Sequence, residues 1–156
     1  MRKVEKGSLQ AMNLRADPPQ VSVIIPTYNR AGCLREAVDS VLFQEFRGFE
    51  LIVVDDGSTD GTSQLLRKYG GSIRVLRQEN RGVSAARNAG IAASRGELIA
   101  FLDSDDIWLS GKLACQVEFF RWNPEILICQ TEELWVKNGR RVNPGTRHRK
   151  RGRSSW

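Results

Sequence analysis

The chain has 156 residues, of which 40% are hydrophobic and 27% are charged. This balance is typical of one soluble globular domain and excludes a wholly disordered chain. The longest apolar stretches, Val21–Pro26 and Leu98–Leu102, are far shorter than the roughly 20 residues of a membrane-spanning helix. Three widely spaced cysteines and a single histidine, His148, exclude a Cys/His zinc site and disfavour histidine-based nucleophilic catalysis.

The net charge of +6 is concentrated near the C-terminus. Residues 140–153 carry seven Arg and Lys side chains and no acid, which leaves 17 basic and 18 acidic residues elsewhere. We therefore expect a polar extension at 1–19, an α/β domain at 20–137 and a basic, disordered tail at 138–156. A nucleic-acid-associated protein acting through this tail is one alternative, although no recognised nucleic-acid-binding module accompanies it and no nucleic-acid partner is expected.

Strand-like and helix-like segments alternate from Val21 onward, which predicts an α/β fold with a parallel sheet and right-handed crossovers. Ser58, Thr59 and Asp60 are candidate N-caps of the second helix, and Gly96 is predicted to end the third. In chain order, the predicted elements are a strand at Val21–Pro26, a helix at Cys33–Glu45, a strand at Phe49–Val54, a helix at Thr59–Tyr69, a strand at Ile73–Arg77, a helix at Val83–Ser94, a strand at Leu98–Leu102, a helix at Gly111–Arg121, a strand-like segment at Glu125–Gln130, and a hairpin at Asn138-Gly139 between Leu134–Lys137 and Arg140–Val142.

Polar clusters follow three of the predicted strands directly. They are Thr27–Arg30, Asp55–Ser58 and Asp103–Asp106. Because ligands of open α/β sheets bind beyond the carboxyl ends of the strands, we expect these clusters to form one site. No glycine-rich phosphate-binding motif follows the first strand, which disfavours dinucleotide oxidoreductases and P-loop NTPases.

Asp103 and Asp105 are separated by one residue where a strand ends, so their carboxylates can converge on one point. Such a pair is unfavourable unless a cation or hydrogen-bond donors compensate it, and oxygen-only ligands favour Mg²⁺ or Mn²⁺. The functional interpretation is a metal ion that holds a diphosphate. The alternative is an acidic loop that caps the next helix, because a D-x-D triplet alone is a weak motif.

Three further features, an acidic pair, a tyrosine and an arginine, each have both a functional and a structural interpretation. One carboxylate of the pair Asp55-Asp56 can accept from a nucleobase or a ribose hydroxyl, but D-G-S-T-D is also a good turn and cap sequence. Tyr28 can stack on a base or belong to the core. Arg87 can pair with phosphate or with Asp56, or be an ordinary surface arginine.

Four blocks of the sequence closely resemble the N-terminal half of the family 2 glycosyltransferases. The resemblance covers about residues 20–135. It implies a Rossmann-like GT-A nucleotide-diphospho-sugar transferase fold, an open, mostly parallel sheet with helices on both faces. The matching blocks are VSVIIPTYNR (21–30), ELIVVDDGSTDGT (50–62), NRGVSAARNAGI (80–91) and GELIAFLDSDDIW (96–108).

The resemblance also implies roles for individual residues. Asp56 would contact the base, Pro26 and Tyr28 would line its pocket, and Arg87 would lie on the nucleotide side. Asp103 would face the ribose or the metal, and Asp105 would coordinate a divalent cation, Mg²⁺ or Mn²⁺. The remaining nucleotide-binding candidates are Thr27, Asn29 and Ser104.

The family implies an inverting, metal-dependent transfer of sugar from a nucleoside-diphosphate donor to an acceptor hydroxyl, with a carboxylate as general base. This base is an aspartate of a later block, and here no acid occurs after Glu133. Glu132 and Glu133 fall in the wrong block, so no catalytic residue is assigned. We expect a truncated chain, incomplete at the acceptor side, that carries only the donor-binding half. A non-catalytic nucleotide-sugar-binding fragment is the alternative.

The expected partners follow from the same resemblance. The donor would be a nucleotide-diphosphate sugar, with a UDP-sugar favoured, and the acceptor would be a saccharide or a lipid-linked molecule. We expect a cytoplasmic protein, with peripheral association at the inner face of the membrane, that works in polysaccharide biosynthesis for the cell envelope. The N-terminus has no apolar segment of the kind found in secretory signals.

Overall fold

The structure is a computed structural model that describes residues 18–137 and 140–142. The chain divides into two compact units, Met1–Cys115 and Gln116–Trp156.

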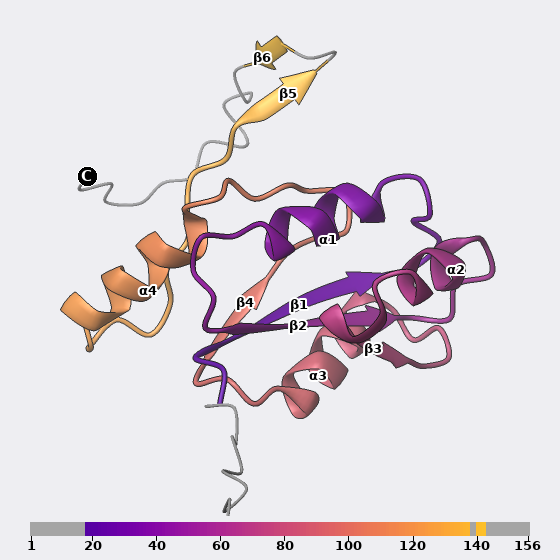
Figure 1. Cartoon of the computed structure of the whole chain (residues 1–156), viewed down its shortest axis with the longest axis horizontal. Helices are drawn as coiled ribbons and strands as arrows, with labels where there is room; N and C mark the ends of the chain where they lie inside the picture. The colour runs from indigo at the N-terminus through magenta and orange to yellow at the C-terminus, as the bar shows by residue number, and fades with distance from the viewer. Residues whose placement is uncertain (1–17, 138–139, 143–156) are drawn as a thin grey trace, which may run out of the picture. The chain divides into compact units, whose positions relative to one another are not determined.

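The first unit is built on one parallel sheet with the strand order β3-β2-β1-β4 (Figure 1). The alternation of strands and helices predicted from the sequence is confirmed, with boundaries that differ by one to three residues at most ends. The elements are β1 (Val21–Thr27), α1 (Leu34–Leu42), β2 (Phe49–Asp55), α2 (Thr62–Arg67), the 3₁₀ helix η1 (Gly70–Ser72), β3 (Arg74–Arg77), α3 (Val83–Ala93) and β4 (Leu98–Phe101), followed by α4 (Lys112–Trp122), which runs into the second unit.

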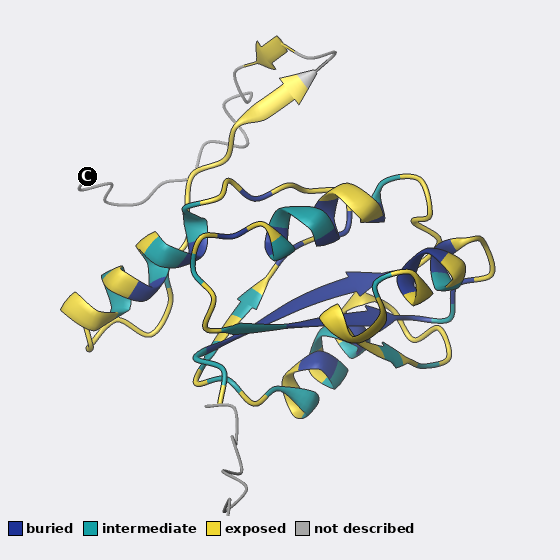
Figure 2. Cartoon of the chain, viewed as in Figure 1, coloured by how far each residue is buried: buried dark blue, intermediate teal, exposed yellow. Residues whose placement is uncertain are grey.

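The centre of the sheet forms the core of this unit. Every residue of β1 is buried, and so are the last five of β2 (Figure 2). Ile24, Ile52 and Val54 pack with Ala86 of α3 on one face. α1 lies on the other face and buries its own apolar stripe there (Figure 1). The near-continuous apolar runs of β1 and β2 are therefore explained by helices on both faces of the sheet.

α3 approaches β1 closely because Gly90 has no side chain. A Cβ atom at Gly90 would lie 2.5 Å from Cγ2 of Ile24, which is closer than any real contact of this kind. We expect Gly90→Ala to lower the free energy of unfolding by about 2 kcal/mol, because overpacking outweighs the gain in helix propensity. Urea unfolding followed by circular dichroism measures this. Gly111→Ala is the control, since its Cβ would meet nothing within 4 Å, and an equal loss in both variants would contradict the packing explanation.

The start of α2 differs from the prediction. The helix begins at Thr62 with Gly61 at its N-cap, and this glycine has no side chain to cap it. The prediction of a start at Thr59 with Ser58, Thr59 or Asp60 as cap is therefore wrong. Ser58 and Asp60 instead bind the loop that follows β1, and Asp60 also accepts a hydrogen bond from the Thr62 amide at 2.9 Å. Asp60 therefore serves both the first amide of α2, from one residue before the N-cap, and the loop after β1.

α3 stops at Ala93, one residue before the predicted end at Ser94, and its C-cap is Ser94, so Gly96 does not end the helix. Gly96 instead marks a close approach of the chain to β1. A Cβ there would lie 2.6 Å from the backbone nitrogen of Ser22. The Gly96 amide donates to Oγ of Ser22 at 2.8 Å, which fixes the chain just before β4.

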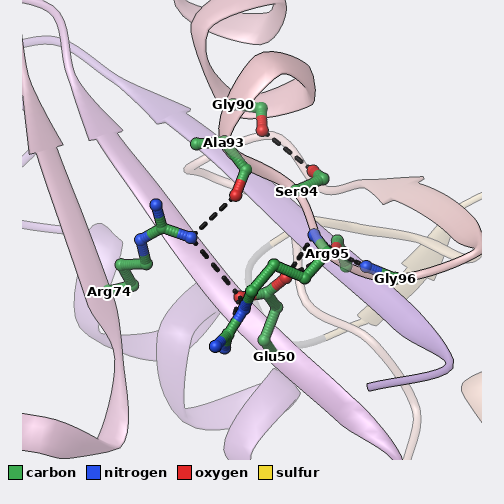
Figure 3. A network of polar contacts seen from close by, with 8 residues as sticks. Glu50, Arg74, Gly90, Ala93, Ser94, Arg95 and Gly96 are labelled. Carbon is green, nitrogen blue, oxygen red and sulfur yellow. Dashed lines mark hydrogen bonds and ion pairs between the residues drawn. The ribbon is translucent and has the colours of Figure 1, made fainter. Parts of the chain in front are cut away.

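A charged network ties the strands together at their amino-terminal ends (Figure 3). Glu50 of β2 accepts from Oγ of Ser22 at 2.8 Å and from the backbone amide and Nε of Arg95 at 2.8 and 3.0 Å. Its second oxygen also faces Nη1 of Arg74 at 3.7 Å. Burial raises the pKa of the Glu50 carboxyl, but the bonds from Ser22 and Arg95 outweigh this effect and hold the pKa below its ordinary value.

The second unit contains the rest of α4 and an antiparallel pair, β5 (Trp135–Lys137) and β6 (Arg140–Val142). These two strands confirm the predicted hairpin, and its turn, Asn138-Gly139, lies outside the described residues. Most of the expected N-terminal extension and basic tail, residues 1–17 and 143–156, also lies outside them. None of the helices in the described part of the chain is long and apolar enough to cross a membrane.

The predicted strand at Glu125–Gln130 is wrong. These residues form no strand, and the Ile126 amide closes a turn onto the carbonyl of Asn123. Leu127 and Ile128 are 88% and 86% exposed, and no described strand pairs with them. An apolar run of this length is ambiguous unless a neighbouring strand covers it.

Candidate functional site

The site lies at the carboxyl edge of the sheet. The chain crosses from β1 to β2 and β3 in one direction and then returns to place β4 on the other side of β1. This reversal between β1 and β4 is the topological switch point at which open α/β sheets bind ligands. As predicted, the clusters Thr27–Arg30, Asp55–Ser58 and Asp103–Asp106 follow β1, β2 and β4 at this edge.

Asn29 joins the loop after β1 to the loop after β2. Its backbone has a φ of 52°, in the left-handed region that asparagine tolerates better than most residues. Its amide donates to Oγ of Ser58 at 3.0 Å, and its Oδ1 accepts from the Thr59 amide at 2.8 Å. Asn29 therefore holds the two loops together, and its contact with a nucleotide stays a prediction.

Two more hydrogen bonds complete this connection. The Arg30 amide donates to Oγ1 of Thr62 at 3.0 Å, and the Ala31 amide donates to Oδ2 of Asp60 at 3.2 Å. The side-chain and backbone hydrogen bonds from Thr62, with that from Ala31, hold the pKa of Asp60 below its ordinary value. The D-G-S-T-D-G-T segment thus fixes the backbone that presents Thr27 and its neighbours.

Asp55 has a structural role in the same loop. Its side chain is buried, and its two oxygens accept from the Ser58 amide and from Oγ of Ser63, both at 2.9 Å. Nε of Arg77 lies 3.9 Å from the carboxylate. The turn-and-cap interpretation of the Asp55-Asp56 pair therefore applies to Asp55.

Asp56 is also buried, but it organises the loop that leads into α3. Its Oδ1 accepts from Nε2 of Gln78 at 2.6 Å and from the Arg81 amide at 3.0 Å, and its Oδ2 accepts from the Gly82 amide at 2.8 Å. Burial raises the pKa of Asp56, and these hydrogen bonds outweigh it, so the pKa lies below its ordinary value. A carboxylate has about four acceptor positions, so one position on Oδ2 is left by the three bonds.

The end of β1 presents one aromatic ring and one unpaired hydroxyl. Tyr28 is 45% exposed, so it does not belong to the core, and its ring is accessible for stacking. Thr27 is only 3% exposed, and its Oγ1 has no hydrogen-bond partner among the described residues. Pro26 is buried within β1. A buried hydroxyl without a partner is unfavourable, so a ligand or water that reached it after a local rearrangement would be bound favourably.

Arg87 of α3 pairs with Asp103 and not with Asp56. Its Nη2 lies 2.6 Å from Oδ1 of Asp103, and its guanidinium lies 5.7 Å from the ring centre of Phe101. The hypothesis of a pair with Asp56 is therefore wrong, and Arg87 is a partly exposed arginine that is paired with Asp103. The contact brings α3 to the acidic loop after β4.

The D-x-D loop alternates exposed and buried side chains. The side chain of Asp103 is 52% exposed, Ser104 is buried and Asp105 is exposed. The amide of Asp106 closes a turn onto the carbonyl of Asp103 at 3.1 Å. Because α4 begins only at Lys112, this loop does not contain the N-cap residue of the next helix.

The donor set of this loop fits a divalent cation of the magnesium type. Asp103 and Asp105 offer carboxylate oxygens, and no described residue makes a hydrogen bond or ion pair with Asp105. The described residues contain no cluster of three or more His, Cys, Asp or Glu side chains. Mg²⁺ and Mn²⁺ sites of one or two carboxylates, completed by water and phosphate oxygens, need no larger cluster.

Two residues that the sequence analysis missed hold the segment after the acidic loop. Gln44, two residues after the end of α1, is fully buried, donates to the carbonyl of Leu109 at 2.7 Å and accepts from the Leu113 amide at 3.0 Å. Ser40 of α1 accepts from the Trp108 amide at 3.1 Å. Ser40 lies in α1 and Gln44 just beyond its end, and polar residues among the apolar ones of this segment were the available signal.

This fold and this edge place the chain among the α/β proteins that bind ligands beyond the carboxyl ends of parallel strands. Residues 22–154 match the family model for glycosyl transferase family 2, and the chain belongs to this family. An uncharacterized glycosyltransferase of Rickettsia felis is 46% identical over 106 residues, which are 67% of this chain and 18% of that protein.

Solved structures confirm the GT-A-type fold. S. aureus TarS matches 67% of this chain and 20% of its own, with a TM-score of 0.63 and 34% identity. TarS 1–349 in complex with UDP-GlcNAc matches 66% of this chain and 31% of its own, with a TM-score of 0.60 and 33% identity. The mannosyltransferase PcManGT of Pyrobaculum calidifontis, in complex with GDP-Man and Mn²⁺, is also similar. It matches 67% of this chain and 33% of its own, with a TM-score of 0.59 and 31% identity. The chain thus spans between 18% and 33% of the length of these proteins.

Proposed function

We propose that this chain binds the nucleotide-sugar donor of an inverting, metal-dependent glycosyl transfer. One observation carries the proposal: three polar loops lie at one edge of the sheet, where Asp105 is exposed and the buried Asp56 uses three of about four acceptor positions. The family membership and the UDP-GlcNAc and GDP-Man complexes of the structural neighbours support it.

The nucleoside would be recognised by the loops after β1 and β2. The remaining acceptor position of Asp56 would take an N–H group of the base, and the exposed ring of Tyr28 would stack on the base plane. The unpaired hydroxyl of Thr27 and the buried ring of Pro26 would form the floor of this pocket. We favour a UDP-sugar, because TarS 1–349 has structures with UDP-GlcNAc and with UDP.

The diphosphate would be held at the acidic loop. Asp103 and Asp105 would hold Mg²⁺ or Mn²⁺ there, with Ser104 beside them, and the cation would neutralise charge on the departing nucleoside diphosphate. The Mn²⁺ complex of PcManGT supports a metal in this family of folds.

In the proposed reaction an acceptor hydroxyl attacks the anomeric carbon as the bond from that carbon to the diphosphate oxygen breaks, and a carboxylate takes the hydroxyl proton. We assign this base to no residue of the chain, because Glu132 and Glu133 lie in the second unit. The acceptor would be a saccharide or lipid-linked hydroxyl at the inner face of the membrane. A fragment that binds nucleotide-sugar without catalysis is the second candidate, and it predicts UDP binding without sugar transfer.

Calorimetric titration of the whole chain with UDP tests the proposal. We expect binding in the presence of Mn²⁺, strong weakening without it, and loss of the metal effect in Asp105→Ala. Asp106→Ala is the control, because this neighbouring acid lies outside the proposed ligand pair, and it should keep metal-dependent binding. A folded chain that binds neither UDP nor any other nucleoside diphosphate would refute the proposal.

A further inference from the structure

One of the two proposed metal ligands, Asp103, is already paired with a positively charged side chain of the protein. Nη2 of Arg87 lies 2.6 Å from Oδ1 of Asp103, at the distance of a strong charge-assisted hydrogen bond. The two side chains are 37% and 52% exposed, so both can move without opening the core. The Asp103 carboxylate is therefore neutralised before any ligand arrives.

The hydrogen-bonding capacity of the Arg87 side chain is not fully used. Its guanidinium lies over the ring of Phe101 and donates to Asp103, but its Nε is buried and has no hydrogen-bond partner among the described residues. A buried N–H group without an acceptor is unfavourable. The side chain would therefore gain a hydrogen bond if a rearrangement brought Nε to an anionic oxygen.

We propose that Arg87 is a positioning residue that withholds Asp103 from the divalent cation until a nucleoside diphosphate binds. This inference rests on the proposed function. A guanidinium and a divalent cation repel each other at one carboxylate oxygen, so Arg87 weakens metal binding to the free chain. The diphosphate provides oxygens to which Arg87 transfers, and Asp103 is then released to act as a metal ligand.

Nucleotide and metal are therefore coupled through Arg87. Each must raise the affinity for the other by the same factor, because coupling between two binding sites is reciprocal. Direct contact between metal and diphosphate contributes to this factor in any such site. The contribution that belongs to Arg87 is the part that disappears when its side chain no longer competes for Asp103.

The test is a titration of the whole chain with Mn²⁺ alone, followed by the paramagnetic resonance signal of free Mn²⁺. We expect Arg87→Gln to bind Mn²⁺ roughly tenfold more tightly than the unmodified chain, because one positive charge has left Asp103. The gain should vanish in the double variant Arg87→Gln/Asp103→Asn. Arg87→Lys, which keeps the charge, should show less gain than Arg87→Gln and serves as a second, milder replacement.

Arg81→Gln is the matched control. It removes one positive charge from the segment just before α3, and the Arg81 backbone amide donates to Asp56 and not to Asp103. An equal gain in Arg81→Gln and Arg87→Gln, or no gain in Arg87→Gln, would overturn the inference. Repeating the Mn²⁺ titration with UDP present should show a smaller effect of UDP in Arg87→Gln than in the unmodified chain.

The two proposals fail separately. Normal metal-dependent UDP binding with an unchanged Mn²⁺ affinity in Arg87→Gln would contradict the role of Arg87 and leave the donor site intact. A chain that binds no nucleoside diphosphate would contradict the donor site, whatever Arg87→Gln does to Mn²⁺ alone.

Discussion

Asp56→Asn is expected to weaken UDP binding by at least about 100-fold and to lower the free energy of unfolding by about 2–3 kcal/mol. Both oxygens of Asp56 accept hydrogen bonds from N–H groups, those of Gln78, Arg81 and Gly82. An asparagine has one acceptor oxygen, so its NH₂ group must face a donor on one side. The substitution keeps the shape of the side chain but breaks a hydrogen bond that holds the loop before α3 in place.

The neighbouring residue provides the control. In Asp55→Asn the new NH₂ group can face Oγ of Ser63, which is able to accept a hydrogen bond, while the Ser58 amide keeps its acceptor. We expect a smaller loss of stability and an almost unchanged affinity for UDP. Calorimetric titration and urea unfolding of both variants measure the two effects. Equal UDP affinities in the two variants would show that Asp56 does not recognise the nucleotide.

Glu50→Ala is expected to lower the free energy of unfolding by about 3 kcal/mol at pH 7 and to leave UDP affinity unchanged. The carboxylate is nearly buried, at 8% side-chain exposure, and it accepts bonds from Ser22 and Arg95 beside the charge of Arg74. Its removal leaves these donors without their acceptor at the end of the sheet opposite the site. Glu97→Ala, an exposed acid close by in the chain, should stay within about 0.5 kcal/mol of the unmodified protein.

The effect of Glu50 should depend on pH in a defined direction. The folded-state pKa of Glu50 lies below its ordinary value of 4.5, so the unfolded chain takes up a proton first as the pH falls. The stabilisation is therefore fully present above about pH 5 and is lost as the pH falls through the folded-state pKa. Urea unfolding of the unmodified chain and Glu50→Ala at several pH values should show their difference shrinking below pH 4.5. A difference that is constant down to pH 3 would contradict an ionic role.

The sheet could be predicted from the sequence because its strands have a strong local signal. The runs in β1 and β2 are almost wholly apolar and β-branched, and each ends in a polar cluster. The failures occurred where a tertiary contact or its absence decided the outcome. Cap-type residues at Ser58 and Asp60 serve the neighbouring loop, and the apolar run at Glu125–Gln130 has no described strand to cover it.

The candidate site could be located but not resolved into roles. Strand ends placed the three clusters at one edge, but nothing local separates Asp55 from Asp56 in a D-D pair. Their different partners, Ser63 for one and Gln78 with Arg81 for the other, depend on the fold. The same holds for the pair of Arg87 with Asp103, which joins two elements through the sheet geometry.

The central claim is that a nucleoside diphosphate binds at the carboxyl edge of this sheet. Amide chemical-shift mapping of the whole ¹⁵N-labelled chain with UDP and Mg²⁺ tests it most directly. We predict that the shifts concentrate in Thr27–Arg30, in Asp56–Gly57, in Arg81–Gly82 and in Ser104–Asp106, and that the amides of Glu50 and Arg95 stay unchanged. Shifts centred on Glu50 and Arg95, or no shifts at saturating UDP, would contradict the account.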